Sequence, residues 1–170
     1  AQLQVLSLTS EENMMTGEVT SEQTRIDLPQ MTEPVKNIFV DPRQQWLYVV
    51  NGRAQADVFS LRDNSLNGRY KLLENGDAQV TAATQLVGGI SLIIGDSKGG
   101  LAQWFMARDP DGELRFKQIR TFQMGSAPIV EISAEERRKG FVALDAAVKL
   151  GVFHSTAHPT LLVDQVVDRQ

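Results

Sequence analysis

The chain of 170 residues contains no cysteine. Disulfide bonds, thiol catalysis and cysteine-based zinc sites are therefore excluded, whereas the cellular compartment stays open. A basic surplus is also missing, because the formal net charge is −4, and this argues against nucleic acid as the main partner. Long apolar runs are absent too, since the longest weakly polar run, Leu86–Gly95, is about half as long as a membrane-spanning helix.

Helical periodicity is scarce along the chain. Short runs rich in valine, isoleucine, leucine and phenylalanine recur instead, separated by glycine, asparagine, aspartate and proline. Runs of this length and spacing predict an all-β fold. The best helical candidate is Ser133–Gly140, where Ser133 has the chemistry of an N-cap. Its consecutive charged residues favour a solvated loop instead.

Three stretches share one pattern of an apolar strand, an asparagine or aspartate, a short turn and a second strand. The stretches are Val49–Asp63, Ile93–Asp109 and Ala143–Ala157. Their turn residues are Asn51, Asp96 and Asp145. Their second strands carry the apolar pairs Val58-Phe59, Trp104-Phe105 and Val152-Phe153. The step from Phe59 to Phe105 is 46 residues and that from Phe105 to Phe153 is 48 residues, so we interpret the pattern as an internal repeat.

A further predicted strand lies before and after each of these stretches. Those before are Val35–Val40, Val80–Leu86 and Ile129–Ser133, and those after are Arg69–Leu73, Leu114–Phe122 and Thr160–Val163. Four short strands at a period in the forties indicate a β-propeller blade, which must stack on its neighbours because one sheet cannot cover both of its faces. A β-sandwich whose hairpins resemble one another by chance is the alternative.

We therefore predict a single propeller-like (WD40-like) domain over residues 1–170, with about three and a half blades. A partial blade covers residues 1–34, and whole blades cover 35–78, 79–127 and 128–170. Closed propellers have four to eight blades. The sequence thus predicts part of a larger propeller, or a homodimer that completes one ring.

The glycine-rich stretch Gly95–Gly100 has the opening spacing of a phosphate-binding loop. Leu101 and Ala102 stand where that motif needs lysine and serine or threonine, and a strand-like run follows instead of a helix. The equivalent turns of the other repeats read NGRAQ and DAAVK. The stretch therefore predicts a tight hairpin turn in which Asp96 bonds within the turn.

No group of residues predicts an active site, a metal site or a cofactor, and we expect a non-enzymatic protein. His154 and His158 have a spacing seen in zinc sites, but on one strand they lie about 13 Å apart and further ligands are missing nearby. Asp109–Leu114 resembles a calcium loop without its third acidic ligand and final glutamate, so it predicts a turn. Serines such as Ser97 and Ser155 stand outside any nucleophile elbow.

One predicted hairpin gathers the basic residues Arg108, Arg115 and Lys117. Arg115 and Lys117 share a strand face, because side chains two apart on a strand point the same way. Together these residues are candidates for contacting an anion or an acidic partner. Ordinary solubilising charge is the alternative interpretation.

The second and third repeats resemble a known family. The motifs GDSKGGLAQWF, KGF and STAH, which lie between Val80 and Leu162, are similar to those of the large soluble insert of long phosphate ABC transporter permeases from Gram-negative bacteria. In that family the insert is a WD40-like, propeller-type region outside the cytoplasm, between the first transmembrane helix and the transport domain. This chain lacks the Trp-Asp dipeptide of WD40 repeats and any permease signature, so transport itself is not assigned to it.

The resemblance implies a periplasmic domain of an inner-membrane protein that serves phosphate uptake. Its implied partners are the remainder of the permease chain, the other transporter subunits and the phosphate-binding protein. We expect a non-catalytic docking or assembly module without a cofactor. Direct sensing of phosphate or a related anion is one alternative, and a free-standing WD40-like adaptor is another.

Overall fold

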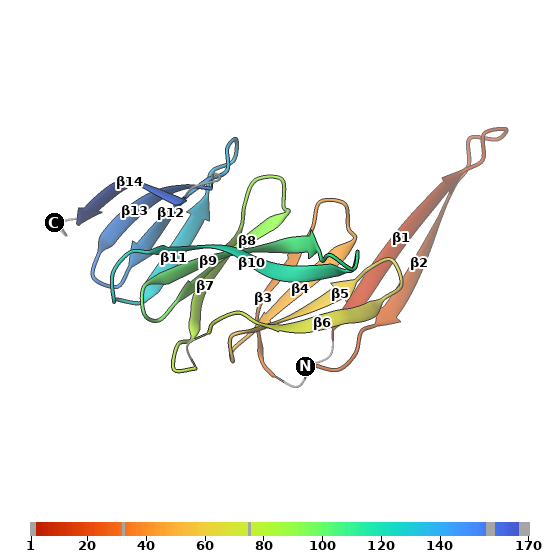
Figure 1. The fold of residues 1–170 in the computed structure, drawn as a ribbon. Coiled ribbons are helices and arrows are strands. Elements are labelled where there is room, and N and C mark those ends of the chain that lie inside the picture. The colour runs from red at the N-terminus through yellow and green to blue at the C-terminus, as the bar shows by residue number, and fades with distance from the viewer. Residues whose placement is uncertain (1–2, 32, 75, 156–158, 167–170) are drawn as a thin grey trace.

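The computed structural model describes residues 3–31, 33–74 and 76–155, together with the backbone of 159–166. Every regular element in these ranges is a β-strand, and the strands pair antiparallel (Figure 1). The described part of the chain has no helix long and apolar enough to cross a membrane. The predicted all-β class is confirmed.

A two-stranded hairpin comes first along the chain, and three four-stranded sheets follow it in order. The hairpin pairs β1 (Gln4–Glu12) with β2 (Val19–Asp27). Sheet I contains β3 (Val35–Val40), β4 (Trp46–Asn51), β5 (Gln55–Ser60) and β6 (Ser65–Lys71). Sheet II contains β7 (Val80–Gln85), β8 (Ser91–Asp96), β9 (Gly100–Arg108) and β10 (Leu114–Gln123). Sheet III contains β11 (Ile129–Ala134), β12 (Gly140–Asp145), β13 (Lys149–Ser155) and β14 (Pro159–Val166).

The hydrophobic core between sheets I and II is centred on Phe116 of β10. Its ring lies 5.1 Å from that of Tyr48, 5.8 Å from that of Tyr70 and 5.3 Å from that of Trp104, measured between centroids. Residues of β4 alternate between this core and the opposite face, as the pleat of a strand requires. The two middle strands of sheet I are therefore buried on both faces. β4 is a nearly continuous apolar run, whereas β5 includes the buried Asp57.

A second core lies between sheets II and III. The rings of Phe122, Phe141 and Phe153 meet there with centroids 5.0–5.4 Å apart. Ile93 and Ile129 are fully buried in the same cluster. Each sheet thus buries a face against its neighbour, which is the stacking that the four-strand repeat predicts.

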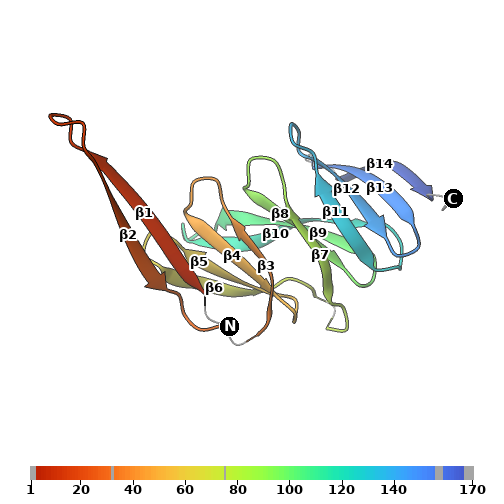
Figure 2. The ribbon, with the colours of Figure 1, turned by 180° about the vertical axis from the view of Figure 1, so that it is seen from behind.

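The β1–β2 hairpin is attached to the body at its base only. Leu3 and Val5 pack with Leu47 and Phe59 on the face of sheet I that points away from sheet II. Beyond this base, the two strands project from the body, as both views of the ribbon show (Figures 1 and 2). The burial pattern agrees, because almost all residues of β2 are exposed.

Strand pairing corrects one detail of the predicted repeat. Leu47 pairs with Phe59, Leu92 with Trp104 and Phe141 with Phe153. The structural equivalent of Phe59 and Phe153 is therefore Trp104, whereas the sequence pattern had aligned them with Phe105. Two adjacent aromatic residues allow either alignment in the sequence, and only the pairing of β8 with β9 selects between them.

Two other local predictions have different outcomes. Ser133 and Ala134 end β11, and the charged residues after them form a loop, so the preferred interpretation of Ser133–Gly140 is confirmed. The strand predicted at Arg69–Leu73 is displaced, because β6 runs from Ser65 to Lys71. Three of its first four residues, Ser65, Asn67 and Gly68, are polar or glycine, so this part of the strand lacks the apolar pattern by which strands are predicted.

Candidate functional site

The turns between the second and third strands of the three sheets share one hydrogen-bond pattern. Asn51 Oδ1 accepts bonds from the backbone N–H groups of Arg53 (3.0 Å) and Gln55 (3.1 Å). Asp96 and Asp145 accept the same two bonds, from the second and fourth residues after them, at 2.7–3.0 Å. The N–H groups that a phosphate-binding loop would aim at an anion are thus used inside the turn.

The basic residues predicted as anion or partner contacts lie on the β9–β10 hairpin of sheet II. Arg115 Nε lies 2.6 Å from Asp109 Oδ2, and Lys117 pairs with the same carboxylate. Arg108 Nη1 donates to the carbonyl oxygen of Gly112 at 2.7 Å. These three cations are engaged within their own hairpin, and their contact with an external anion or partner stays a prediction.

Two segments of the sequence partly resemble metal sites, and their described residues form a turn and part of a strand. At Asp109–Leu114 the backbone N–H of Gly112 donates to the carbonyl of Asp109 at 2.8 Å, as in a tight turn. His154 lies on β13, whereas His158 lies outside the described residues. Over residues 3–31, 33–74 and 76–155, no three histidine or carboxylate side chains are grouped to hold a metal ion.

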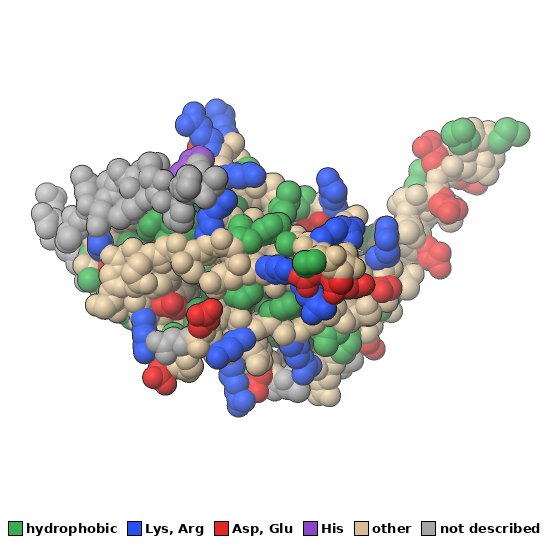
Figure 3. Space-filling view, viewed as in Figure 1, with side chains coloured by type: hydrophobic (Ala, Val, Ile, Leu, Met, Phe, Trp, Pro, Cys, Tyr) green, Lys and Arg blue, Asp and Glu red, His purple; other side chains and the backbone are tan. Residues whose placement is uncertain are grey.

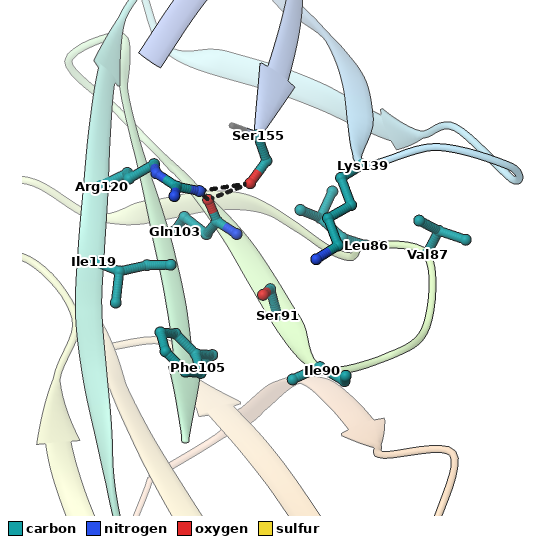
Figure 4. Close-up of a pocket in the computed structure, with 10 residues that line it drawn as sticks. All are labelled: Leu86, Val87, Ile90, Ser91, Gln103, Phe105, Ile119, Arg120, Lys139 and Ser155. Carbon is teal, nitrogen blue, oxygen red and sulfur yellow. Dashed lines mark hydrogen bonds between the residues drawn. The ribbon is translucent and has the colours of Figure 1, made fainter. Parts of the chain in front are cut away.

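A groove of about 450 Å³ lies between sheets II and III (Figure 4). Residues of the β7–β8 connection form one side of it, and residues of β9 and β10 form another. The β11–β12 loop and the end of β13 supply the rest. The groove is therefore built from two successive repeats, and neither sheet forms it alone.

Three polar side chains join the two sheets at this groove. Ser155 Oγ on β13 donates to Gln103 Oε1 on β9 at 2.7 Å. Arg120 Nη1 on β10 donates to the same Gln103 oxygen at 3.2 Å and to Ser155 Oγ at 2.9 Å. Gln103 and Ser155 are buried, which strengthens these bonds because water does not compete for them. The guanidinium group of Arg120 is thus held in place at the wall of the groove.

Arg120 and Lys139 give the groove a positive charge. Within the part of the chain that the structure describes, no carboxylate lies within ion-pair distance of either side chain. In Figure 4 the side chain of Lys139 extends from the β11–β12 loop toward the groove, of which it forms part of the lining. A half-buried arginine whose fork is held in place is suited to binding a carboxylate through two parallel hydrogen bonds.

The remaining walls of the groove are largely apolar. Ile90 is 62% exposed and Ile119 is 37% exposed, and the ring of Phe105 is half-buried beside them (Figure 4). Apolar side chains next to cations are a composition suited to contact with another protein segment.

The sequence analysis did not find this groove. Gln103 was the one available signal, because it is polar where the equivalent positions of the other repeats hold Val58 and Val152. Arg120 and Lys139 lie nineteen positions apart in the sequence and come together only because sheet III packs on sheet II. Nothing in the spacing of the residues predicts that packing.

Comparison with known proteins by sequence finds no counterpart, since neither a protein-family model nor a curated protein matches the chain. Solved structures do match. The β-propeller domain of Cps50 (Swd1) from Myceliophteria thermophila has a TM-score of 0.66 at 11% identity, over 85% of this chain and 49% of that one. The WD40 repeats of RRP9 have a TM-score of 0.63 at 10% identity, over 81% and 40% of the two chains. For U3-55K the TM-score is 0.64 at 10% identity, over 82% and 41%.

The chain therefore spans half or less of the length of these propellers. Because the sequence identities are so low, the likeness concerns the fold alone. Blades of four antiparallel strands, stacked face to face in chain order, agree with that likeness. The chain has the fold of a WD40-like β-propeller over part of a ring.

Proposed function

We propose that the chain is an extracytoplasmic, non-catalytic module of a phosphate ABC transporter permease, which holds the transporter assembly together by docking a protein segment. The groove between sheets II and III is the docking site. The observation that carries the proposal is the pair of cations, Arg120 and Lys139, that no described carboxylate neutralises. The transporter context is supported by the resemblance of GDSKGGLAQWF, KGF and STAH to the permease insert.

The side chains that line the groove define the kind of segment that it binds. Arg120 and Lys139 attract a carboxylate, and the exposed side chains of Ile90 and Ile119 gain free energy when apolar side chains cover them. An acidic segment with apolar residues beside its carboxylates satisfies both requirements. The segment belongs to another transporter subunit, to the phosphate-binding protein or to a second copy of the permease.

Photo-crosslinking in the assembled transporter tests the docking site. A photoreactive residue is introduced in place of Ile90, whose exposure lets it reach a bound segment, and the full permease is mixed with purified transporter subunits and the phosphate-binding protein. We expect a crosslink to one of these proteins or to a second copy of the permease, identified by mass spectrometry. A probe at Ile90 that reaches none of them would refute docking at the groove.

Phosphate uptake by cells tests the proposed role in a phosphate transporter. Arg120→Glu with Lys139→Glu in the full permease reverses the charge of the groove, and we expect slower uptake. The matched control is Arg43→Ala with Arg62→Ala, which removes two exposed cations from the turns of sheet I. Equal uptake by both variants would contradict the proposal.

Calorimetric titration with inorganic phosphate, with sulfate as control, separates docking from sensing, because a selective micromolar response would identify a sensor.

A further inference from the structure

The tip of the β1–β2 hairpin presents two methionines to solvent. Met14 is 98% exposed and Met15 is 95% exposed. The tip is an ordered turn, because Asn13 Oδ1 accepts a bond from the N–H of Met15 at 2.9 Å and the Asn13 carbonyl accepts one from Gly17 at 2.7 Å. Gly17 has a φ of 71°, which a residue without a side chain adopts readily. Two neighbouring apolar side chains held outward in this way indicate a contact element.

The distal half of the hairpin has no support from the body of the protein. Leu8 is 69% exposed and Val19 is 63% exposed, in contrast to Val5 at the base, which packs on sheet I. A two-stranded hairpin is marginally stable in water by itself. Strands of nine residues rise about 30 Å, so the hairpin extends well beyond the sheet that anchors it. Its distal half therefore has the length and exposure of an arm that binds elsewhere.

The hairpin is acidic where the groove is basic. Residues 4–27 contain five acidic side chains and one basic side chain. Glu11 and Glu12 directly precede the tip, and Glu18 follows it. In Figure 3 acidic side chains line the projecting arm and apolar side chains form its end, whereas basic side chains lie on the body. Acid and methionine at the tip thus complement cation and isoleucine in the groove.

We propose that the groove between sheets II and III receives the β1–β2 hairpin tip of a second copy of this chain. The carboxylates next to the tip, those of Glu11, Glu12 and Glu18, bring negative charge to Arg120 and Lys139, and the tip methionines cover the exposed apolar wall. Methionine suits this role because its flexible thioether side chain fills irregular apolar surfaces. This inference names the partner of the docking site and so rests on the proposed function.

The arrangement of the loops allows both copies to dock at once. Both ribbon views show the hairpin tip and the β7–β8 and β11–β12 loops, which border the groove, projecting to the same side of the body (Figures 1 and 2). A two-fold axis beyond that side places the hairpin of each copy over the groove of the other. The result is a closed dimer with two identical contacts, the commonest symmetry of soluble oligomers.

A charge-swap experiment with sedimentation velocity tests the inference. We expect the unmodified chain to dimerise. One variant carries Glu11→Lys and Glu12→Lys, and the other carries Arg120→Glu and Lys139→Glu. Each variant alone places like charges in both contacts, so we expect its dimer to weaken by more than about 10-fold. Mixed together, the variants restore opposite charges in both contacts, and we expect a heterodimer. Failure of the mixture to associate would refute the pairing.

Two controls keep the result interpretable. Met14→Ser with Met15→Ser changes side chains that contact solvent alone, so the fold is preserved and we expect the dimer to weaken. Val142→Arg changes the outer face of sheet III, where a ring of stacked sheets would be closed instead. Loss of the dimer in this variant, with no effect at the methionines, would replace hairpin exchange by ring closure.

The outcome separates this inference from the proposed function. A monomeric chain whose probe at Ile90 crosslinks to a different transporter subunit would overturn the hairpin exchange and keep the docking module. A dimer that follows the charge swap, combined with unchanged phosphate uptake in the groove variant, would keep the exchange and overturn the transporter role.

Discussion

Gly99 is a position where the fold leaves no room for a side chain. It is the fourth residue of the β8–β9 turn and has a φ of 79°. The equivalent residues are Ala54, with a φ of 58°, and Val148, with a φ of 65°, so the backbone conformation itself accepts a side chain in two repeats. Gly99 differs because a Cβ there would lie 2.5 Å from the carbonyl oxygen of Gly125 and 2.9 Å from that of Ala127.

The expected cost of Gly99→Ala has two parts. Placing alanine at positive φ costs about 1 kcal/mol. The clash adds about 1–3 kcal/mol, because the neighbouring atoms belong to the backbone that leads from β10 to β11 and cannot rotate away. We therefore expect the free energy of unfolding to fall by about 2–4 kcal/mol.

Gly112→Ala is the matched control in the same sheet. Gly112 has a φ of 84°, and a Cβ there meets nothing within 4 Å, so it reports the backbone term alone, about 1 kcal/mol. Urea unfolding followed by tryptophan fluorescence measures both variants, since Trp46 and Trp104 lie in sheets I and II. Equal losses for Gly99→Ala and Gly112→Ala would refute the steric argument. A gain in stability at Gly99 would also refute the assigned backbone conformation.

Three further predictions concern the cores and the buried polar groups. Phe116→Ala removes the ring at the centre of the core between sheets I and II, and we expect urea unfolding to show a loss of about 3–5 kcal/mol. Ser155→Ala removes a buried hydroxyl that bonds across sheets II and III, and the same assay should show a loss of about 1–2 kcal/mol. Burial raises the pKa of Asp57, and Arg69, with Nε 3.5 Å from its Oδ1, partly offsets the rise. When the pKa of a carboxyl is raised in the folded state, the folded state loses stability as the pH rises from the usual aspartate range through that raised value. The stability of the unmodified protein relative to Asp57→Asn should therefore fall as the pH rises through this window, and a constant difference would contradict the shift.

Much of the fold follows from short-range patterns in the sequence. β3 has the bounds that its apolar run predicts, and β10 and β11 each extend one residue past theirs. Such strands are recognisable because their apolar side chains face a core. β6 was displaced because it lies at the edge of its sheet, where polar residues and Gly68 replace that pattern.

The site was beyond the reach of the same patterns. Gln103 and Ser155, which bond across sheets II and III, are separated by 52 positions. Their contact depends on how the two sheets pack, and packing of this kind has no fixed spacing along a chain. Arg115 and Lys117 show a further limit, because the sequence shows their charge but does not show that Asp109 pairs with both.

Because the sheets stack in series, each sheet is energetically coupled only to the sheets next to it. Sheet II contributes side chains to both inter-sheet cores, while the β1–β2 hairpin contacts the base of sheet I. Each contact is therefore a nearest-neighbour coupling, as in a one-dimensional array. We expect that filling the groove would slow amide hydrogen exchange in β9 and β13 and leave β4 almost unaffected, because protection is local to the coupled units. The arm and the groove of a single copy are thus independent, and any cooperativity between them comes from a neighbouring molecule.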